Sequence, residues 1–289
     1  FNTNAVSLAA DTSITIRELL NLLGTGDWFR DYYLLPFSGA IWSTPKDKIL
    51  DFPAHSMISF FENHALLSRT GQHEWFTING GSVQYVDRLN KELVNRNVEL
   101  RLGDPIKEVR RGPFGVQILS QKSEIEFFDH VVFATHSDDT LKMLADPSKG
   151  EATALGAIKF QPNQAVLHHD QNVMPKNRNC WASWVYTEDK KTSLNPIGLT
   201  YWMNSLQPIP ESDPMFVTLN SKNKIDPYKI YDEATFMHPV YDLPALNAQK
   251  DLAENNGKKN TWFCGAWMKN GFHEDCLLYT SDAADEKRC

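Results

Sequence analysis

The stretch of this chain best suited to binding a ligand lies near its end. Thr261–Ala266 is an apolar run that stops at Gly265-Ala266, the pattern of a buried strand that enters a tight turn. A second turn follows at Asn270-Gly271, and Glu274-Asp275 suits the first turn of a helix. A strand, a glycine and a helix N-terminus together present free backbone N–H groups to an anion or to a polar ring edge. Many α/β turns share this pattern without holding a ligand.

A second candidate is the Gly80-Gly81 step, where a backbone without side chains permits close approach to something flat or anionic. Neither a G-x-G-x-x-G nor a G-x-x-x-x-G-K-[ST] pattern occurs in the chain, so no phosphate-binding loop of either kind is predicted. His168 and His169 are adjacent on a predicted strand, so their rings point to opposite faces and cannot jointly hold a metal. We therefore expect no metal site.

Composition narrows the classes of partner. The net charge is −7 and no basic run occurs, which disfavours nucleic acid and anionic membranes as partners. No apolar run approaches the roughly 18 residues that a membrane-spanning helix needs. Of the four cysteines only Cys180 and Cys264 precede the C-terminal tail, without C-x-x-C spacing, so neither a zinc site nor a disulfide framework is indicated. A reducing, cytoplasmic setting fits best, with a small molecule as the substrate.

The elements that must position these residues alternate in type along the chain. Apolar positions at helical spacing predict helices at Ile14–Leu23, Met57–Leu67, Val83–Asn95 and Ala245–Asn255. Period-two or near-continuous apolar runs predict strands, among them Val98–Leu102, Phe114–Leu119, Phe127–Thr135, Ala165–His169, Cys180–Tyr186, Ile197–Met203 and Met215–Asn220; Pro227–Met237 fits either a short helix or a strand. This order predicts an α/β fold with mixed α+β character, in which two domains interleave with breaks near residues 75, 150 and 256.

The last residues have a different character from the rest. Cys276–Glu286 resembles the translation of a transposon-end sequencing adapter. We therefore expect residues 276–289 to be a non-native tail and leave them out of the fold prediction. An unusual natural tail is the alternative.

Five stretches carry a resemblance to a known family. W-F-C-G-A followed by G-F-H-E-D, at residues 261–275, resembles the last FAD-contacting segment of the FAD-dependent amine-oxidase-like superfamily. Four further stretches resemble its bacterial branch of predicted NAD/FAD-binding proteins in the same order: Phe29–Phe52, Thr77–Val86, Phe127–Thr135 and Gln161–Trp184. The resemblance covers nearly the whole chain up to Asp275.

The resemblance implies a two-domain fold, with an incomplete Rossmann-type FAD-binding domain and a substrate domain of helices and a mixed or antiparallel sheet. Residues 1–75 would form the helical part of the substrate domain and 151–255 its β-rich part. Residues 76–150 and 256–275 would belong to the FAD-binding domain. In the family the dinucleotide fingerprint lies upstream of everything present here, so the resemblance also implies a fragment that holds FAD poorly and is inactive by itself.

The resemblance also assigns roles to positions. Ile106 would meet the adenine edge through its backbone, and Ala134-Thr135 would pass under the dinucleotide. Gly80-Gly81 would face the isoalloxazine. Gly265, Ala266, Phe272, His273 and Glu274 would line the ribityl and pyrimidine end of the flavin. His273 is the one candidate for catalysis, with a supporting hydrogen bond as the alternative role.

Two departures bear on the activity. Many amine oxidases have Glu where this chain has Ala266, and no convincing lysine occupies the place near Pro162–Ala165 where many hold a water beside the flavin. The aromatic candidates for substrate contact are Trp42, Trp184, Tyr201 and Trp202, each of which could equally belong to the core. The implied function is oxidation of a C–N or C–C bond in a largely apolar substrate. The alternatives are a desaturase or isomerase of a lipid-like substrate, and a non-catalytic binding module that has lost FAD.

Overall fold

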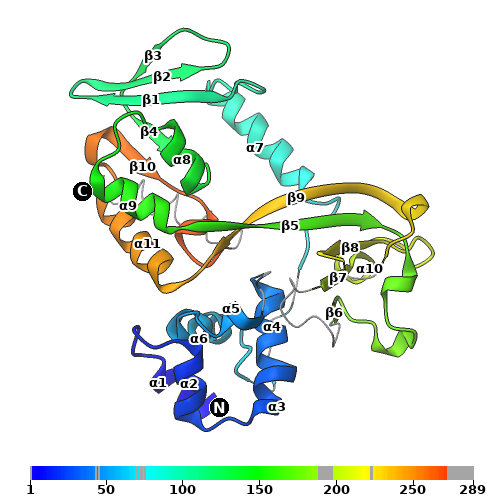
Figure 1. The fold of residues 1–289 in the computed structure, drawn as a ribbon. Coiled ribbons are helices and arrows are strands. Elements are labelled where there is room, and N and C mark those ends of the chain that lie inside the picture. Colours follow the sequence, from blue (N-terminus) through cyan, green and yellow to red (C-terminus); the bar gives the residue numbers. More distant parts are fainter. Residues whose placement is uncertain are drawn as a thin grey trace. The chain divides into compact units, whose positions relative to one another are not determined.

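The computed structural model describes residues 2–42, 44, 46–68, 70–71, 74, 76–187, 198–221 and 224–271, and the side chains from residue 4 on. These residues form two compact units, each built from two separate stretches of chain (Figure 1). Unit 1 holds residues 1–100 and 161–238, and unit 2 holds residues 101–160 and 239–289. The predicted interleaved, mixed α/β architecture is confirmed. Its breaks lie at residues 100, 160 and 238, where we expected 75, 150 and 256.

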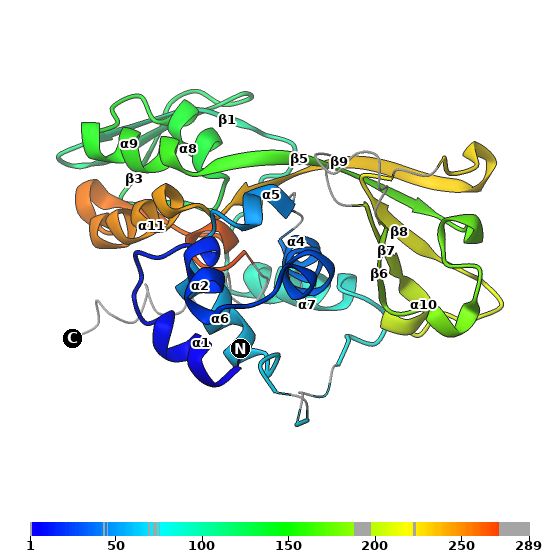
Figure 2. The same cartoon turned by 60° about the horizontal axis from the view of Figure 1, so that its bottom comes forward.

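The first part of unit 1 is helical (Figure 2). Its elements are α1 (Asn2–Leu8), α2 (Ile16–Leu23), α3 (Asp27–Phe29), the π-helical η1 (Arg30–Leu34), α4 (Leu35–Ile41), α5 (Lys46–Ile49), α6 (Ala54–Asn63) and α7 (Val83–Asn95). Helix α2 begins at a capping box, in which the Thr15 side chain accepts from the Glu18 N–H and Glu18 accepts from the Thr15 N–H. It ends at Gly24, whose φ of 62° is the left-handed cap that glycine favours. Thr15 is therefore the N-cap of α2 and Gly24 its C-cap.

The second part of unit 1 is a five-stranded sheet in the order β6-β7-β8-β5-β9. Its strands are β5 (Lys159–His168), β6 (Trp184–Thr187), β7 (Gly198–Trp202), β8 (Phe216–Leu219) and β9 (Ile230–Val240), and the short helix α10 (Met203–Leu206) follows β7. Strand pairs β6–β7, β7–β8 and β5–β8 are antiparallel. One face packs on Ala40 of α4 through Ala165, Leu199 and Leu219. The other face covers a second apolar cluster around Phe216. The ambiguous stretch from Pro227 is thus mostly strand.

A chain of buried polar side chains crosses this sheet. The Nδ1 atom of His168 accepts from the Asp170 N–H at 3.1 Å, so its proton sits on Nε2, which donates to the Thr218 hydroxyl at 2.7 Å. Thr218 and Thr200 share a hydroxyl hydrogen bond of 3.0 Å. Burial lowers the pKa of His168 from 6.5 to about 4, against a smaller opposing effect of Asp170. The ring is therefore neutral, and each of its nitrogens has a partner.

Unit 2 combines two small sheets with helices. Strands β1 (Ile106–Gly112), β2 (Gly115–Ser120) and β3 (Glu126–Phe128) form an antiparallel sheet, and β4 (Val131–Phe133) pairs in parallel with β10 (Thr261–Phe263). The helices are α8 (Ser137–Met143), α9 (Lys149–Ala157) and α11 (Leu243–Asn255). The core joins Val109 and Val116 of the first sheet to Phe133 and Phe263 of the second and to Leu252 of α11. The single strand expected at Phe127–Thr135 is split in two, because the chain changes sheets after Phe128.

A buried ion cluster ties β1 to α9 in unit 2. The Arg111 side chain is 1% exposed and donates to both carboxylate oxygens of Glu151, at 2.5 and 3.0 Å, and to Asp146. Glu151 also completes a capping box with Ser148 at the start of α9. Burial by itself would raise the pKa of Glu151, but the bonds from Arg111 and Ser148 outweigh it and lower the pKa to about 2.

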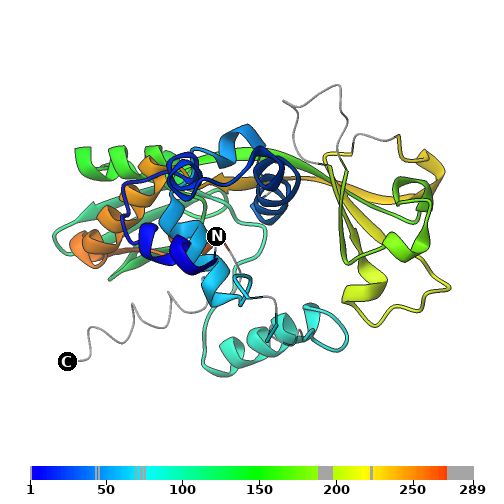
Figure 3. The ribbon, with the colours of Figure 1, turned by 90° about the horizontal axis from the view of Figure 1, so that it is seen from below.

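Helix α7 and the residues after it lack the packing that their patterns predict. The helix, drawn in cyan in Figure 3, has the predicted bounds. No residue in it is buried, and Val83 and Leu89 are more than half exposed. The strand expected at Val98–Leu102 does not form, and Leu102 is 88% exposed. A strand needs a neighbour for its backbone hydrogen bonds, and the described residues supply none there.

No helix in the described ranges is both long enough and apolar enough to cross a lipid bilayer.

Glu151→Gln should lower the free energy of unfolding at neutral pH by about 2–4 kcal/mol, because the buried Arg111 guanidinium loses a carboxylate. The pKa of Glu151 is depressed from 4.5 to about 2, so its contribution is complete above pH 4.5 and is lost as the pH falls towards 2. Urea unfolding followed by circular dichroism measures both effects. Glu92→Gln is the control, since the Glu92–Arg96 pair is 54% and 73% exposed and should matter by less than about 0.5 kcal/mol. Equal effects of the two substitutions would contradict the prediction.

Thr218→Val should cost about 1–3 kcal/mol of stability, because it leaves the buried Nε2–H of His168 without an acceptor while keeping the side chain's shape. Thr153→Val is the matched control, since the Thr153 hydroxyl is exposed on α9. A thermal shift no larger than the control's would show that the buried bond contributes nothing.

The protonation of His168 gives a separate test. Its folded pKa is below the unfolded 6.5, so stability is greatest above pH 6.5 and declines as the pH falls to about 4. An NMR titration of the histidine rings should find His168 neutral, with its proton on Nε2, until the pH approaches 4. A midpoint near 6.5 would show that the ring is open to water.

Candidate functional site

The parallel pair of strands in unit 2 brings two distant parts of the chain together. In its register Thr261 lies opposite Val131 and Phe263 opposite Phe133, and the Cys264 N–H donates to the Phe133 carbonyl at 2.9 Å. Parallel strands end at the same edge of a sheet, which is where α/β proteins place their ligands. The residues that follow the two strands, Ala134-Thr135 and Gly265-Ala266, therefore lie side by side.

The turn at Gly265 is one that only glycine adopts without strain. Its φ is 138° and its ψ 164°, and a Cβ there would lie 2.9 Å from Nε1 of Trp267. The Trp267 indole is buried and donates through Nε1 to the Thr135 carbonyl at 3.0 Å. This hydrogen bond locks the turn after β10 onto the residue after β4.

Three residues that the sequence analysis missed hold this turn in place. Besides Trp267, the Gln249 amide of α11 donates to the carbonyls of Trp267 and Lys269 at 2.8 and 2.7 Å. The Tyr241 hydroxyl donates to the Ala266 carbonyl at 3.4 Å. The sequence could have indicated Trp267, because a buried indole needs a hydrogen-bond acceptor and this one lies two residues after Gly265. Nothing in the sequence indicates the roles of Gln249 and Tyr241.

The remaining predicted flavin contacts come from three further parts of the chain. Ile106 begins β1, in the antiparallel sheet of unit 2, and its side chain is 39% exposed. Gly80 and Gly81 belong to unit 1 and have φ angles of 83° and 82°, so the expected turn before α7 does require glycine. Phe272, His273 and Glu274 lie outside the described residues.

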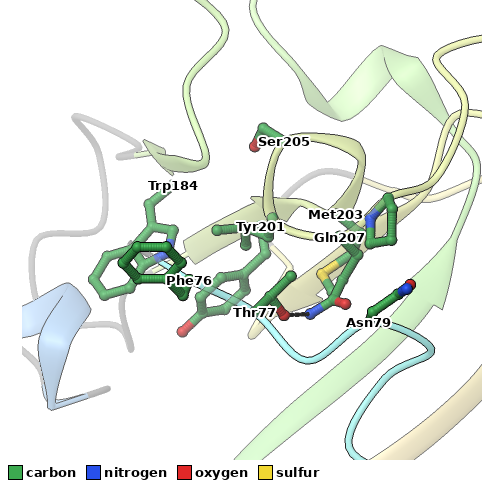
Figure 4. A pocket seen from close by; sticks show the side chains of 10 residues that line it. Phe76, Thr77, Asn79, Trp184, Tyr201, Met203, Ser205 and Gln207 are labelled. Atoms are coloured by element: carbon green, nitrogen blue, oxygen red, sulfur yellow. Dashed lines mark hydrogen bonds between the residues drawn. The ribbon is translucent and has the colours of Figure 1, made fainter. Parts of the chain in front are cut away.

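Unit 1 contains a pocket of about 700 Å³ on the β6–β7 side of its sheet (Figure 4). Trp184 lies opposite Tyr201 in the strand register, with ring centroids 5.7 Å apart and planes at 72°. Both were predicted to contact substrate, and both line this pocket. The other lining residues are Phe76, Thr77, Asn79, Met203, Ser205, Leu206, Gln207 and Pro208, none of which the sequence analysis selected.

The remaining two aromatic candidates lie outside this pocket. Trp42 is 8% exposed and packs against Phe52 and Phe60 in the helical part of unit 1. Trp202 follows Tyr201 on β7 and so points to the opposite face, where its ring meets Trp181 at 5.3 Å. Because side chains alternate between the faces of a strand, Tyr201 and Trp202 lie on opposite faces. The rings of Trp42 and Trp202 pack against other aromatic rings of unit 1.

Among the residues that the structure describes, those lining the pocket include no Asp, Glu, Lys, Arg or His. The Gln207 amide donates to the Thr77 hydroxyl at 2.8 Å, which ties the segment before α7 to the loop after α10 (Figure 4). Burial raises the pKa of Tyr201, so its hydroxyl stays protonated across the ordinary pH range.

A third group of polar residues stands at the start of α8. Ligand atoms of His136, Asp138 and Asp139 lie within 4.8 Å of one another. Lys142 pairs with both aspartates, at 3.2 and 2.8 Å. Both carboxylates are thus paired with one lysine of the same helix, an arrangement common among charged side chains on a helix surface.

Comparison with solved structures supports the fold. The chain is similar to a CLA-producing fatty acid isomerase from P. acnes (TM-score 0.61, 13% identity, covering 100% of this chain and 75% of that one). It is also similar to a reduced UDP-galactopyranose mutase (0.63, 11%, 98% and 71%) and to a putrescine oxidase bound to putrescine (0.62, 11%, 98% and 73%). Identities this low show a shared fold alone. No curated protein sequence matches the chain.

The chain also matches a protein-family model over most of its length. Residues 18–198 match the family model described as flavin containing amine oxidoreductase, which covers more than half of the chain. The match includes the pocket strand β6 and the parallel strand β4. This chain therefore belongs to the flavin-containing amine oxidoreductase family.

Proposed function

We propose that the chain is part of an FAD-dependent oxidoreductase that takes a hydride equivalent from a C–N or C–C bond of a largely apolar substrate. The observation that carries the proposal is the meeting of β4 and β10, whose ends are joined by the bond between Trp267 and the Thr135 carbonyl. The glycine-only turn at Gly265 lies at this junction. A flat ring with a polar edge suits such a rim of exposed and fixed backbone.

The residues of this rim would hold the flavin. Ala134 and Thr135 are exposed at the sheet end, and Ala266 begins a short helix whose first amides have no acceptor within that helix. When bound, the flavin would supply a two-electron acceptor, which no amino-acid side chain offers. The roles of Ile106, Gly80-Gly81, Phe272, His273 and Glu274 remain part of the proposal.

The pocket of unit 1 supports the apolar character of the substrate. Phe76, Trp184 and Tyr201 offer ring surface, and none of the described lining side chains carries a charge. A diamine would find no carboxylate among these residues for its two ammonium groups, and an ion that loses water without gaining a partner incurs a large desolvation cost. In the proposed reaction the pocket would orient an uncharged body and keep water from it.

We also propose that the flavin-binding unit is incomplete in this chain. Parallel sheets are normally covered on both faces and have more than two strands. Here β4 and β10 form a pair by themselves, and Val132 of β4 is 60% exposed. The stretch at Val98–Leu102, which forms no strand here, has strand character as well. Additional strands would cover these surfaces, so the chain by itself should bind FAD weakly.

A desaturase or isomerase of a lipid-like substrate remains the alternative reaction, and the neutral pocket favours it as much as it favours oxidation. The isomerase is separated from the oxidase by the state of the flavin after one turnover in the absence of oxygen. Net oxidation, which includes desaturation of a C–C bond, leaves reduced, bleached flavin, whereas isomerisation returns the oxidised spectrum.

Gly265→Ala should weaken FAD binding by at least about tenfold. Positive φ at a non-glycine residue costs about 1–3 kcal/mol, and the added Cβ would also displace the Trp267 indole from Thr135. Quenching of FAD fluorescence on titration with the protein measures the affinity. Gly150→Ala is the control, because Gly150 lies in α9 with no atom within 4 Å of the new Cβ.

Two results of this titration would count against the proposal. An unchanged affinity in Gly265→Ala would exclude the turn from the site. Absence of saturable binding to the unsubstituted chain up to about 1 mM FAD, a binding free energy of about −4 kcal/mol, would favour a module that has lost the cofactor.

A further inference from the structure

The polar side chains of the unit 1 pocket indicate which functional group its ligand would carry. Thr77 and Gln207 are hydrogen-bonded to each other. The Ser205 hydroxyl lies 3.0 Å from that of Ser183 and donates to the Trp202 carbonyl at 2.8 Å. These three groups are therefore already engaged within the protein.

The Tyr201 hydroxyl, like the Asn79 amide and the Trp184 indole N–H, is not engaged in this way. It makes no hydrogen bond to any residue that the structure describes, and it points away from the Thr77–Gln207 contact (Figure 4). The residue is half-buried and lines the pocket. Burial raises the pKa of Tyr201, so the group remains a donor.

The direction of this donor is set by packing. Strand pairing places Tyr201 opposite Trp184, and the edge-to-face contact of the two rings fixes the phenol. The same side of the sheet continues into the apolar cluster of Ala165, Leu199 and Leu219. A ring held in this way loses little freedom when a ligand bonds to its hydroxyl.

We propose that Tyr201 determines specificity by donating a hydrogen bond to a neutral acceptor, such as a ketone, on a ligand whose apolar body lies against Trp184 and Phe76. A ligand that brings an acceptor satisfies a half-buried donor, and one without it leaves that donor unpaired. A cationic ligand meets no carboxylate among the lining residues. The inference rests on the proposed function only in taking this pocket as the place of the substrate.

Three probes of nearly equal size test the inference: acetophenone, ethylbenzene and protonated 1-phenylethylamine. Ligand-observed NMR titrations without flavin give their affinities for the chain. Acetophenone should bind about three- to tenfold more tightly than ethylbenzene, the range of one net hydrogen bond, and more tightly than the ammonium. Tyr201→Phe should remove the preference for acetophenone and leave ethylbenzene unchanged.

Tyr228→Phe is the matched control, because Tyr228 belongs to the same unit and is 96% exposed. Should Tyr201→Phe not fold, the order of the three affinities in the unsubstituted chain decides. Equal binding of acetophenone and ethylbenzene, tightest binding of the ammonium, or no saturable binding of any probe would overturn the inference. Flavin is absent from this experiment, so its failure leaves the flavin proposal standing, and the Gly265 titration leaves this one untouched.

Discussion

The parallel pairing of β4 with β10 is the constraint on which the candidate flavin site depends. Three residues of each strand suffice to set the register, and the register alone decides that Thr135 and Gly265 become neighbours. The hydrogen bond from the Trp267 indole to the Thr135 carbonyl then joins residues 132 positions apart in the chain. Because Gly265 has a φ of 138°, any other residue would strain this junction. A short sheet thus gains a rigid rim at the end where α/β proteins bind ligands.

In unit 1 the two faces of the five-stranded sheet differ in what their side chains contact. Tyr201 and Trp202 are adjacent on β7, yet one lines the pocket and the other packs against Trp181. Within the sheet, His168, Thr218 and Thr200 pair their polar groups with one another, so that burial costs little. On the pocket side, the Tyr201 hydroxyl has no hydrogen-bond partner among the described residues. Polar groups satisfied inside the sheet stabilise the fold, and a donor left open on the pocket side is available to a ligand.

Membership of the flavin-containing amine oxidoreductase family is consistent with a candidate flavin site at the turn after β10 and a candidate substrate pocket in unit 1. It does not name a substrate. The structural neighbours include an isomerase, a mutase and an oxidase, so this fold is compatible with several reactions. What distinguishes the chain is local: a pocket without charged lining residues, and Ala266 in the turn after β10. Both features are the basis for proposing an uncharged ligand rather than a polyamine.

The amino-acid sequence by itself determined the local elements and the special backbone positions. Helix α7 has its predicted bounds, Gly24 ends α2, and Gly80, Gly81 and Gly265 have the positive φ angles for which glycine is required. These follow from short-range sterics and spacing. Only the tertiary structure decided the rest: that Trp42 and Trp202 pack while Trp184 and Tyr201 line a pocket, that Phe127–Thr135 divides between two sheets, and that Val98–Leu102 forms no strand. Whether an apolar residue meets core, pocket or solvent depends on partners distant in the chain, which local pattern does not contain.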